Sequence, residues 1–301
     1  MWLPRFACPE CQSDVHEIEG GERVACGRCD RSYAREQGVW RFLTAARREG
    51  LDPFVRQYRA VREREGRRPS APEYYRRLPS VAPDDPHAGD WRVRRETYHH
   101  LLQHVLAAGP QPIHVLDLGA GSGWLSHRLA ALGHGAVAVD AIDDEVDGLG
   151  AARHYTVAFA VVHADFDALP FAPGQFDLVL FNGSLHYAAD TAATLASAFR
   201  MLASGGTLAV MDSPMFRADR DGSAMVDEKM RHFVLDCGLA DAVPQGIGYL
   251  TFARLAAIAD QLQLRPSFLP SRGPLRWRLA RQLARVRLRR APAAFGLWVA
   301  Q

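Results

Sequence analysis

A glycine-rich turn between two short apolar runs is the feature that most constrains how this 301-residue chain can fold. The first run, 113–118, contains Asp117 and leads into Gly119-Ala120-Gly121-Ser122-Gly123. A helical pattern with leucines at 125, 129 and 132 follows, and a second apolar run ends at Asp140. This order predicts a strand, a turn, a helix and a parallel strand, the unit that binds nucleotides at a switch point of a parallel sheet. Glycines allow a ligand to approach the backbone, and an acid at the tip of the second strand can accept ribose hydroxyls.

The spacing of the turn argues against a dinucleotide ligand. A dinucleotide fingerprint reads G-x-G-x-x-G, whereas Trp124, Leu125 and Ser126 follow Gly123 and the third glycine is absent. An acid just ahead of G-x-G-x-G resembles the first motif of the class I S-adenosylmethionine-dependent methyltransferases. That family binds a cationic sulfonium rather than a pyrophosphate, so a nearby carboxylate is favourable. The alternative interpretation is a structural turn that binds no ligand.

Motifs further along extend the resemblance over about residues 111–212. A strand predicted over 157–162 is followed by D-x-x-x-L-P-F, which begins at Asp165, and then by F-D-L-V. An L-x-x-G-G-x-L ending begins at Leu202. The resemblance implies that Asp165 accepts a hydrogen bond from the adenine amino group and that Phe166 packs on the ring. It also implies that Asn182 and Gly183 lie beside the methionine part of the cofactor.

The same resemblance implies an α/β fold. We expect a Rossmann-like, mostly parallel, seven-stranded sheet with strand order 3-2-1-4-5-7-6 and helices on both faces. The expected S-adenosylmethionine site comprises Asp117, Gly119, Ala120, Gly121, Ser122, Gly123, Asp140, Asp165, Phe166, Asn182 and Gly183. Methyl transfer by in-line displacement depends mainly on alignment and exclusion of water. His186 and Tyr187 are candidates for a general base, and His186 has the alternative role of orienting substrate or capping the following helix.

Two C-x₂-C pairs near the N-terminus predict a metal site. Cys8 and Cys11 are separated by 14 residues from Cys26 and Cys29. Such pairs present four thiolates to one structural Zn²⁺, which would supply folding free energy to so small a unit. The alternative is two redox pairs or disulfides. Tyr33 and the following G-V-W-R-F-L tail resemble small zinc-ribbon domains found beside or fused to methyltransferases.

These patterns divide the chain into a zinc ribbon (1–43), a helical linker and cap (44–110) and a methyltransferase domain (111–301). The linker is expected to hold helices over 52–65 and 91–107, and residues 213–248 form an insertion expected to lie over the substrate.

Charge is segregated along the chain: residues 41–79 hold eleven arginines and five acids, whereas residues 111–212 hold three arginines and eleven acids. A predicted helix over 275–290 lies in a stretch, 265–290, with nine arginines and no acid. That helix could contact an anionic membrane or phosphates, or simply pack on the core.

Length and hydropathy favour a cytoplasmic protein. No apolar run of about 18 residues exists, so no transmembrane helix is expected. Arg5 and Cys8 also interrupt the stretch where a signal peptide would be apolar. The L-P-F…F-D-L-V pattern, the cap and the insertion favour a small hydroxylated or lipid-linked acceptor, and the N-P-P-[YF] signature of base-directed enzymes is absent. RNA is the alternative acceptor, favoured by the ribbon and the arginine-rich flanks, and a non-catalytic cofactor-binding scaffold is the third hypothesis.

Overall fold

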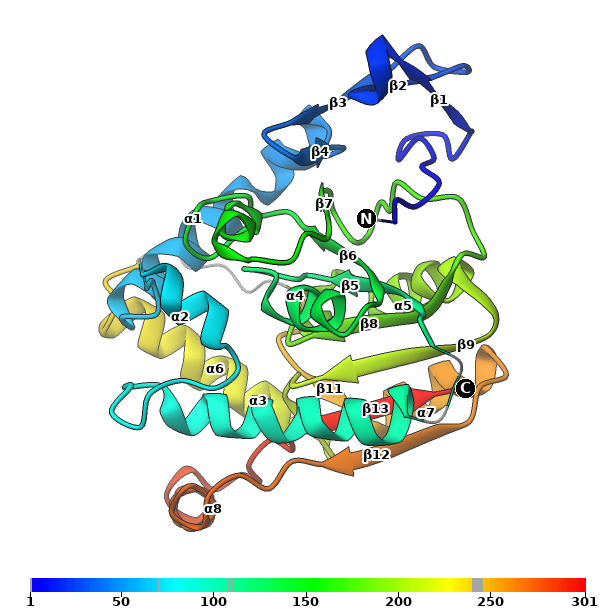
Figure 1. The fold of residues 1–301 in the computed structure, drawn as a ribbon. Helices are drawn as coiled ribbons and strands as arrows, with labels where there is room; N and C mark the ends of the chain where they lie inside the picture. The colour runs from blue at the N-terminus through cyan, green and yellow to red at the C-terminus, as the bar shows by residue number, and fades with distance from the viewer. Residues whose placement is uncertain (1, 70, 108, 110, 240–245) are drawn as a thin grey trace.

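The computed structural model describes residues 2–69, 71–107, 109, 111–239 and 246–301. A mostly parallel sheet runs through the molecule, with helices on both faces (Figure 1). Its central strands are β5 (His114–Leu118), β6 (Gly135–Asp140), β7 (Ala160–His163), β8 (Phe176–Asn182), β9 (Leu202–Met211), β12 (Pro266–Pro270) and β13 (Gly296–Ala300). They lie in the order β7-β6-β5-β8-β9-β13-β12, and β13 is antiparallel to both its neighbours. The α/β class is confirmed, and this central region has the predicted order 3-2-1-4-5-7-6.

Successive residues of each central strand point to opposite faces of the sheet and build two apolar layers. Val115 of β5 packs in the layer covered by α3 (Ala88–Leu101) and α4 (Trp124–Ala131). Leu116, the next residue, packs in the layer covered by α5 (Thr191–Met201) and α7 (Phe252–Gln261). Because both faces are covered, the strands are apolar runs rather than alternating ones, as is typical of parallel sheets.

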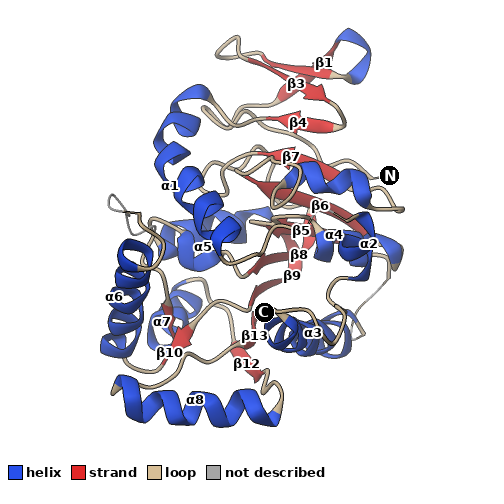
Figure 2. Ribbon diagram, turned by 90° about the vertical axis from the view of Figure 1, so that its left-hand side faces the viewer, coloured by secondary structure: helices blue, strands red, loops and turns tan. Residues whose placement is uncertain are grey.

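The sheet differs from the prediction at its β7 edge, where the cysteine-rich segment extends it. The N-terminal strands β1 (Val15–Ile18), β2 (Arg23–Cys26), β3 (Ser32–Glu36) and β4 (Val39–Arg41) form an antiparallel meander. Strand β4 then pairs in parallel with β7, so that the described residues form one sheet of eleven strands. Phe6, Trp40 and Phe42 pack together across this junction. Figure 2 shows the meander continuing the sheet at one end.

The segment between the meander and β5 is helical, and its first helix, α1, covers the carboxyl ends of the strands. Helix α1 (Ala45–Arg64) begins earlier than the predicted residue 52, because the Thr44 hydroxyl caps it by accepting a hydrogen bond from the Arg47 amide. Helix α2 (Pro72–Arg77) follows, and α3 ends in a π-helical turn, η2 (Leu102–Leu106). The predicted helix over 91–107 is therefore confirmed as α3 and η2 together. Other helical turns are η1 (Glu19–Gly21), η3 (Leu149–His154) and η4 (Leu185–Tyr187).

The C-terminal third adds a small parallel pair and two long helices. Strand β10 (Met215–Phe216) pairs with β11 (Leu250–Thr251), and α6 (Asp219–Leu235) lies between them in sequence. Residues 240–245 of the expected insertion fall outside the described residues. Helix α8 (Leu275–Leu288) connects β12 to β13 and lies at the end of the sheet opposite the meander (Figure 2). Among the described helices, none is both long and apolar enough to cross a membrane.

Candidate active site

A cavity of about 430 Å³ opens at the carboxyl ends of β5, β6, β7 and β8, beneath α1. Strand ends in an open parallel sheet are the usual place for a ligand, because the loops that follow them leave a crevice. Ten of the expected site residues line this cavity. They are Gly119, Ala120, Gly121, Ser122, Asp140, Asp165, Phe166, Asn182, Gly183 and Tyr187.

The glycine turn is held tightly against the sheet. The amides of Gly119 and Ala120 both donate hydrogen bonds to Val139 O, at 2.8 and 2.9 Å. Gly119 has φ +70°, and a Cβ atom there would overlap the Ser184 side chain. Glycine is therefore required at this position for both backbone conformation and space. Because glycine has no side chain, the backbone itself forms the wall of the cavity at this position.

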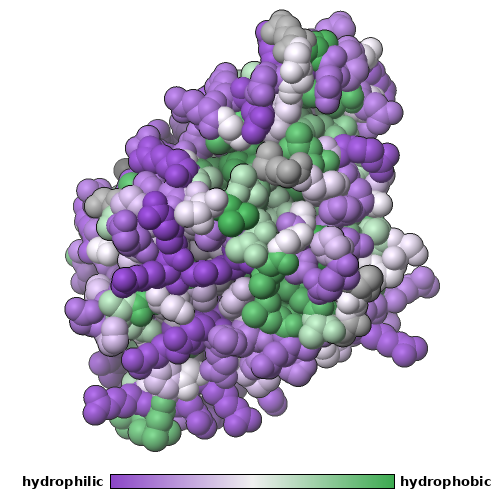
Figure 3. Space-filling model, viewed as in Figure 1, coloured by the Kyte–Doolittle hydropathy of each residue, from purple (hydrophilic) through white to green (hydrophobic). Residues whose placement is uncertain are grey.

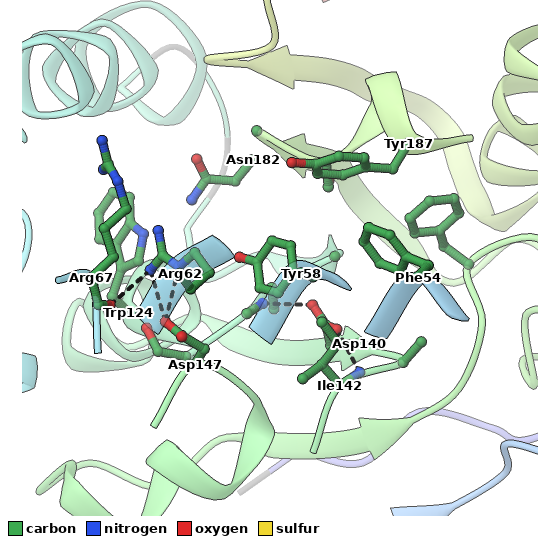
Figure 4. Close-up of a pocket in the computed structure, with 18 of the residues that line it drawn as sticks. Phe54, Tyr58, Arg62, Arg67, Trp124, Asp140, Ile142, Asp147, Asn182 and Tyr187 are labelled. Atoms are coloured by element: carbon green, nitrogen blue, oxygen red, sulfur yellow. Dashed lines mark hydrogen bonds and ion pairs between the residues drawn. The ribbon is translucent and has the colours of Figure 1, made fainter. Parts of the chain in front are cut away.

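Asp140 ends β6 and lies beneath Tyr58 in the cavity (Figure 4). Its two carboxylate oxygens accept hydrogen bonds from the amides of Gly121 and Ile142, each at 2.7 Å. Burial raises the pKa of Asp140 to about 6, although these amide donors favour the charged form. The carboxylate is thus fixed in orientation and keeps lone pairs that can accept hydrogen bonds from a diol.

The ends of β7 and β8 supply the other polar groups. Asp165 is paired with Arg47 from α1, with Nη1 3.1 Å from Oδ2, so its carboxylate is already engaged on one side. Asn182 is buried, and none of the described residues donates a hydrogen bond to its Oδ1. In Figure 4 its amide points into the cavity. An orphaned buried amide oxygen in such a place is a ready acceptor for a ligand.

Helix α1 forms a roof over the first cavity, where the sequence predicted only a cap within residues 44–110. Phe54 and Tyr58, one helical turn apart, face the cavity, and Phe54 also packs on Tyr187 with ring centroids 5.4 Å apart. Further along, Arg62 binds the buried Asp147 at 2.7 Å, and Arg59 binds Asp144 at 3.0 Å. The sequence feature that indicates this roof is the segregation of charge, because the basic segment 41–79 complements the acidic residues that follow β6.

Three expected residues lie outside the first cavity. Asp117 is completely buried behind the turn, where the Ser126 hydroxyl donates a hydrogen bond to Oδ2 at 2.8 Å. Burial raises the pKa of Asp117 to about 7. Gly123 has φ +74° and caps α4. His186 lines a neighbouring cavity instead.

This second cavity, of about 460 Å³, adjoins the first and shares with it Phe54, Tyr58, Gly183 and Tyr187, among others. Its far wall comes from α6 and α8, through Met225, Lys229, Met230, Phe233 and Trp277. The pKa of His186 is lowered to about 3 by burial and by the nearby charges of Lys229 and Arg94. The imidazole is therefore neutral, and it contacts Ser213 Oγ at 3.3 Å. Burial raises the pKa of Tyr187, which remains a phenol.

The four N-terminal cysteines converge on one point, as expected for a metal site. All four sulfur atoms lie within 4.8 Å of one another. The Sγ–Sγ distances are 3.6 Å for Cys8 and Cys29, 3.5 Å for Cys11 and Cys26, and 3.8 Å for Cys11 and Cys29. These separations are too long for disulfides, and all four thiols are free. They match the edge of a tetrahedron with Zn–S bonds of about 2.3 Å, which is roughly 3.8 Å.

Known proteins are similar to the part of the chain that holds the glycine turn and the central strands. Residues 116–210 match a family described as the methyltransferase domain. This part of the chain is a methyltransferase domain. It is 32% identical over 114 residues to a malonyl-[acyl-carrier protein] O-methyltransferase of Erwinia pyrifoliae, covering 38% of this chain and 42% of that protein. It is 35% identical over 114 residues to an uncharacterized methyltransferase of Mycobacterium tuberculosis, covering 38% of this chain and 56% of that protein. The alignments thus span about half the length of these curated relatives.

A solved structure supports the fold of the methyltransferase domain. A Listeria monocytogenes protein assigned to the S-adenosylmethionine-dependent methyltransferases aligns with a TM-score of 0.51 at 17% identity. The alignment covers 69% of this chain and 97% of the Listeria protein. The family resemblance drawn from the glycine turn and the later motifs is therefore confirmed. The roles of individual residues in the two cavities remain predictions.

Proposed function

We propose that this chain is an S-adenosylmethionine-dependent methyltransferase that carries a structural zinc ribbon. The observation that supports this most directly is the first cavity, where a glycine turn, a fixed carboxylate and an orphaned amide meet at the ends of parallel strands. A volume of about 430 Å³ lies in the range of cofactor sites. When bound, the cofactor supplies an electrophilic methyl group on a sulfonium centre.

Each end of the cofactor has a proposed partner in this cavity. The methionine part would lie along Gly119 to Gly121, near the free Oδ1 of Asn182. The ribose hydroxyls would donate to Asp140, and the adenine would lie against Phe166 with its amino group toward Asp165. Because Asp117 lies behind the turn and binds Ser126, we assign it the role of fixing the turn against α4.

The second cavity is the proposed acceptor site, since it adjoins the first across Gly183 and Tyr187. The two cavities together suit a small or lipid-linked acceptor, and the name of the Erwinia relative specifies a carrier-linked acceptor. Lys229 and Arg94 both line the acceptor site, and no described carboxylate lies within ion-pair distance of either. An acceptor that carries an anionic group would complement them. An open second cavity also argues against a non-catalytic scaffold, for which a blocked acceptor site is expected.

No general base is assigned. A histidine with a pKa of about 3 is a weak base, so His186 is better suited to positioning the acceptor through hydrogen bonding. The phenol of Tyr187 is a candidate for positioning as well. Alignment under α1 and exclusion of water are then the main contributions of the protein.

The ribbon cysteines are proposed to hold one structural Zn²⁺. Four sulfur donors complete a tetrahedral shell and leave no open position, so the metal would stabilise rather than catalyse. The ion would stabilise β1 to β4 and, through the pairing of β4 with β7, the edge of the sheet beside the cofactor site.

Transfer of a labelled methyl group tests the function. Purified protein is incubated with S-[methyl-¹⁴C]adenosylmethionine and separated fractions of bacterial lipids, metabolites and RNA. We expect label in the lipid or metabolite fraction, and none with Asp140→Ala. Label in RNA would support the alternative acceptor, and cofactor binding without transfer to any fraction would support the scaffold.

A further inference from the structure

Helix α8 carries an apolar stripe that faces solvent. Leu275, Leu279, Leu283 and Val286 are 66%, 55%, 74% and 79% exposed, and the helix has no buried residue. Spacings of four, four and three residues place these side chains on one face, since successive residues are about 100° apart. An isolated exposed leucine is ordinary, but four on one helix face form a patch that lacks a partner in the described structure.

The opposite face of α8 attaches the helix to the protein. Trp277 and Arg281 lie on that face, and the Arg281 guanidinium stacks 4.1 Å from the Trp277 ring and 5.3 Å from Phe295. Just beyond the helix, Arg290 forms an ion pair with Glu228 of α6 at 2.6 Å. The leucine stripe therefore points outward because the other face is already anchored. Packing on the core, one of the interpretations of the sequence, does not account for the stripe.

Arginines flank the stripe on both sides. By the helical spacing, Arg276 and Arg287 lie along one edge and Arg278 and Arg285 along the other. All four are exposed, and none forms an ion pair or a side-chain hydrogen bond with a described residue. No acid lies between 265 and 290. Figure 3 shows apolar side chains protruding at the lower left edge, where Figure 1 places α8, with hydrophilic groups around them.

We propose that α8 docks on an anionic lipid bilayer. The leucine stripe would enter the interface between headgroups and acyl chains, and the flanking arginines would contact lipid phosphates. This is the geometry of an interfacial amphipathic helix, in which buried apolar area and electrostatic attraction act together. A second copy of the chain is a poorer occupant, since a symmetric contact through this stripe would bring two arginine-rich helices together. Nucleic acid would use the arginines but not the leucines.

Docking would also orient the active site. Trp277 on the anchored face of α8 lines the second cavity, so the bilayer would lie near one wall of the proposed acceptor site. This consequence rests on the proposed function and favours a lipid-linked acceptor. The docking itself rests only on the exposed faces of α8.

Vesicle co-sedimentation tests the docking with the full-length protein. Vesicles of phosphatidylcholine alone are compared with vesicles that contain roughly 30 mol% phosphatidylglycerol. We expect binding to the anionic vesicles, weakened about tenfold or more by Leu279→Gln/Leu283→Gln. Leu235→Gln is the matched control, since Leu235 is 77% exposed on α6, and it should bind like the wild type.

A second pair of variants isolates the charge contribution. Arg278→Gln/Arg285→Gln should weaken binding about tenfold, whereas Arg56→Gln/Arg92→Gln, which removes two exposed arginines elsewhere, should have little effect. All changed side chains are exposed, so unchanged urea unfolding curves would verify the fold of each variant.

Absence of binding to anionic vesicles, or binding that survives the leucine changes, would overturn the proposal. Self-association abolished by those changes would assign the stripe to a second copy, and leucine-independent RNA binding would assign the arginines to nucleic acid.

Discussion

At the scale of single residues, the site is defined by polar groups held at strand ends with their geometry already set. Asp140 accepts two backbone hydrogen bonds before any ligand arrives, so its carboxylate need not reorganise on binding. Asn182 keeps an unpartnered acceptor among the described residues. The same burial that orients these groups makes the charge on Asp140 sensitive to pH.

Affinity for S-adenosylmethionine should therefore fall as the pH is lowered through the pKa of Asp140. The raised pKa, about 6, means that the carboxylate is ionised at pH 7.5 and largely protonated at pH 5. The ionised form is the better acceptor for ribose hydroxyls and attracts the sulfonium, so we expect the dissociation constant to rise about tenfold between these pH values. Titration calorimetry of the wild type and Asp140→Asn would measure this. A variant that keeps the full pH dependence of the wild type would contradict the assignment.

Gly119 offers a second test at this scale. Gly119→Ala must both adopt a positive φ and displace Ser184, and we expect a loss of about 2–4 kcal/mol in unfolding free energy, with weakened cofactor binding. Gly174→Ala is the matched control, because Gly174 has φ +73° and open space around its Cα. It should cost only about 1 kcal/mol. Equal losses in urea denaturation would show that the contact with Ser184 is unimportant.

At the scale of elements, α1 matters because it covers the first cavity and belongs to neither the sheet nor the glycine turn. It is attached by Arg59 and Arg62, which pair with acids in the loop after β6. Phe54 and Tyr58 then form the apolar underside of the roof. The basic linker and the acidic core are thus complementary surfaces within one chain.

Breaking one of these pairs should loosen the roof. Arg62→Met leaves Asp147 buried without its partner, which we expect to cost about 3 kcal/mol in unfolding free energy and to speed proteolysis within α1. Arg153→Met removes an exposed pair with Glu145 and should leave stability unchanged. Urea denaturation and limited proteolysis would measure both effects. An Arg62→Met protein as stable and protease-resistant as Arg153→Met would show that α1 is held by other contacts.

The sequence was sufficient for elements that depend on local pattern. The strands around the glycine turn, α4, α5 and the cysteine site follow from apolar runs, glycine positions and C-x₂-C spacing. By contrast, the pairing of β4 with β7 and of Arg47 with Asp165 joins residues more than a hundred positions apart. No local pattern specifies such contacts. The position of Asp117 behind the turn could not be predicted either, because a motif gives spacing along the chain but not the direction of a side chain.

At the scale of the whole molecule, the sheet connects a cysteine site at one end with α8 at the other (Figure 2). The first cavity lies between them, along the carboxyl ends of the central strands. Because β4 pairs with β7, a change in the stability of the ribbon should also affect the edge of the proposed cofactor site. The strands β13 and β12, at the opposite end of the sheet, do not pair with any described strand of the ribbon.

Loss of the metal should therefore loosen one edge of the sheet selectively. Cys26→Ser/Cys29→Ser is expected to abolish zinc binding and to accelerate amide exchange in β1 to β4 and in β7, because the metal supplies folding free energy to the ribbon. Exchange in β12 and β13 should be unchanged. Cys237→Ser, in a cysteine far from the cluster in sequence, should keep both zinc content and exchange rates. Unaltered exchange in β7 after zinc loss would contradict the coupling.

Direct calorimetric titration with S-adenosylmethionine and S-adenosylhomocysteine tests the central claim of the account. We predict one cofactor site per chain, weakened about tenfold or more by Asp140→Ala, with Asp260→Ala, which removes an exposed acid on α7, binding like the wild type. A folded, zinc-loaded protein that binds neither ligand would contradict the account, as would an Asp140→Ala variant with unchanged affinity.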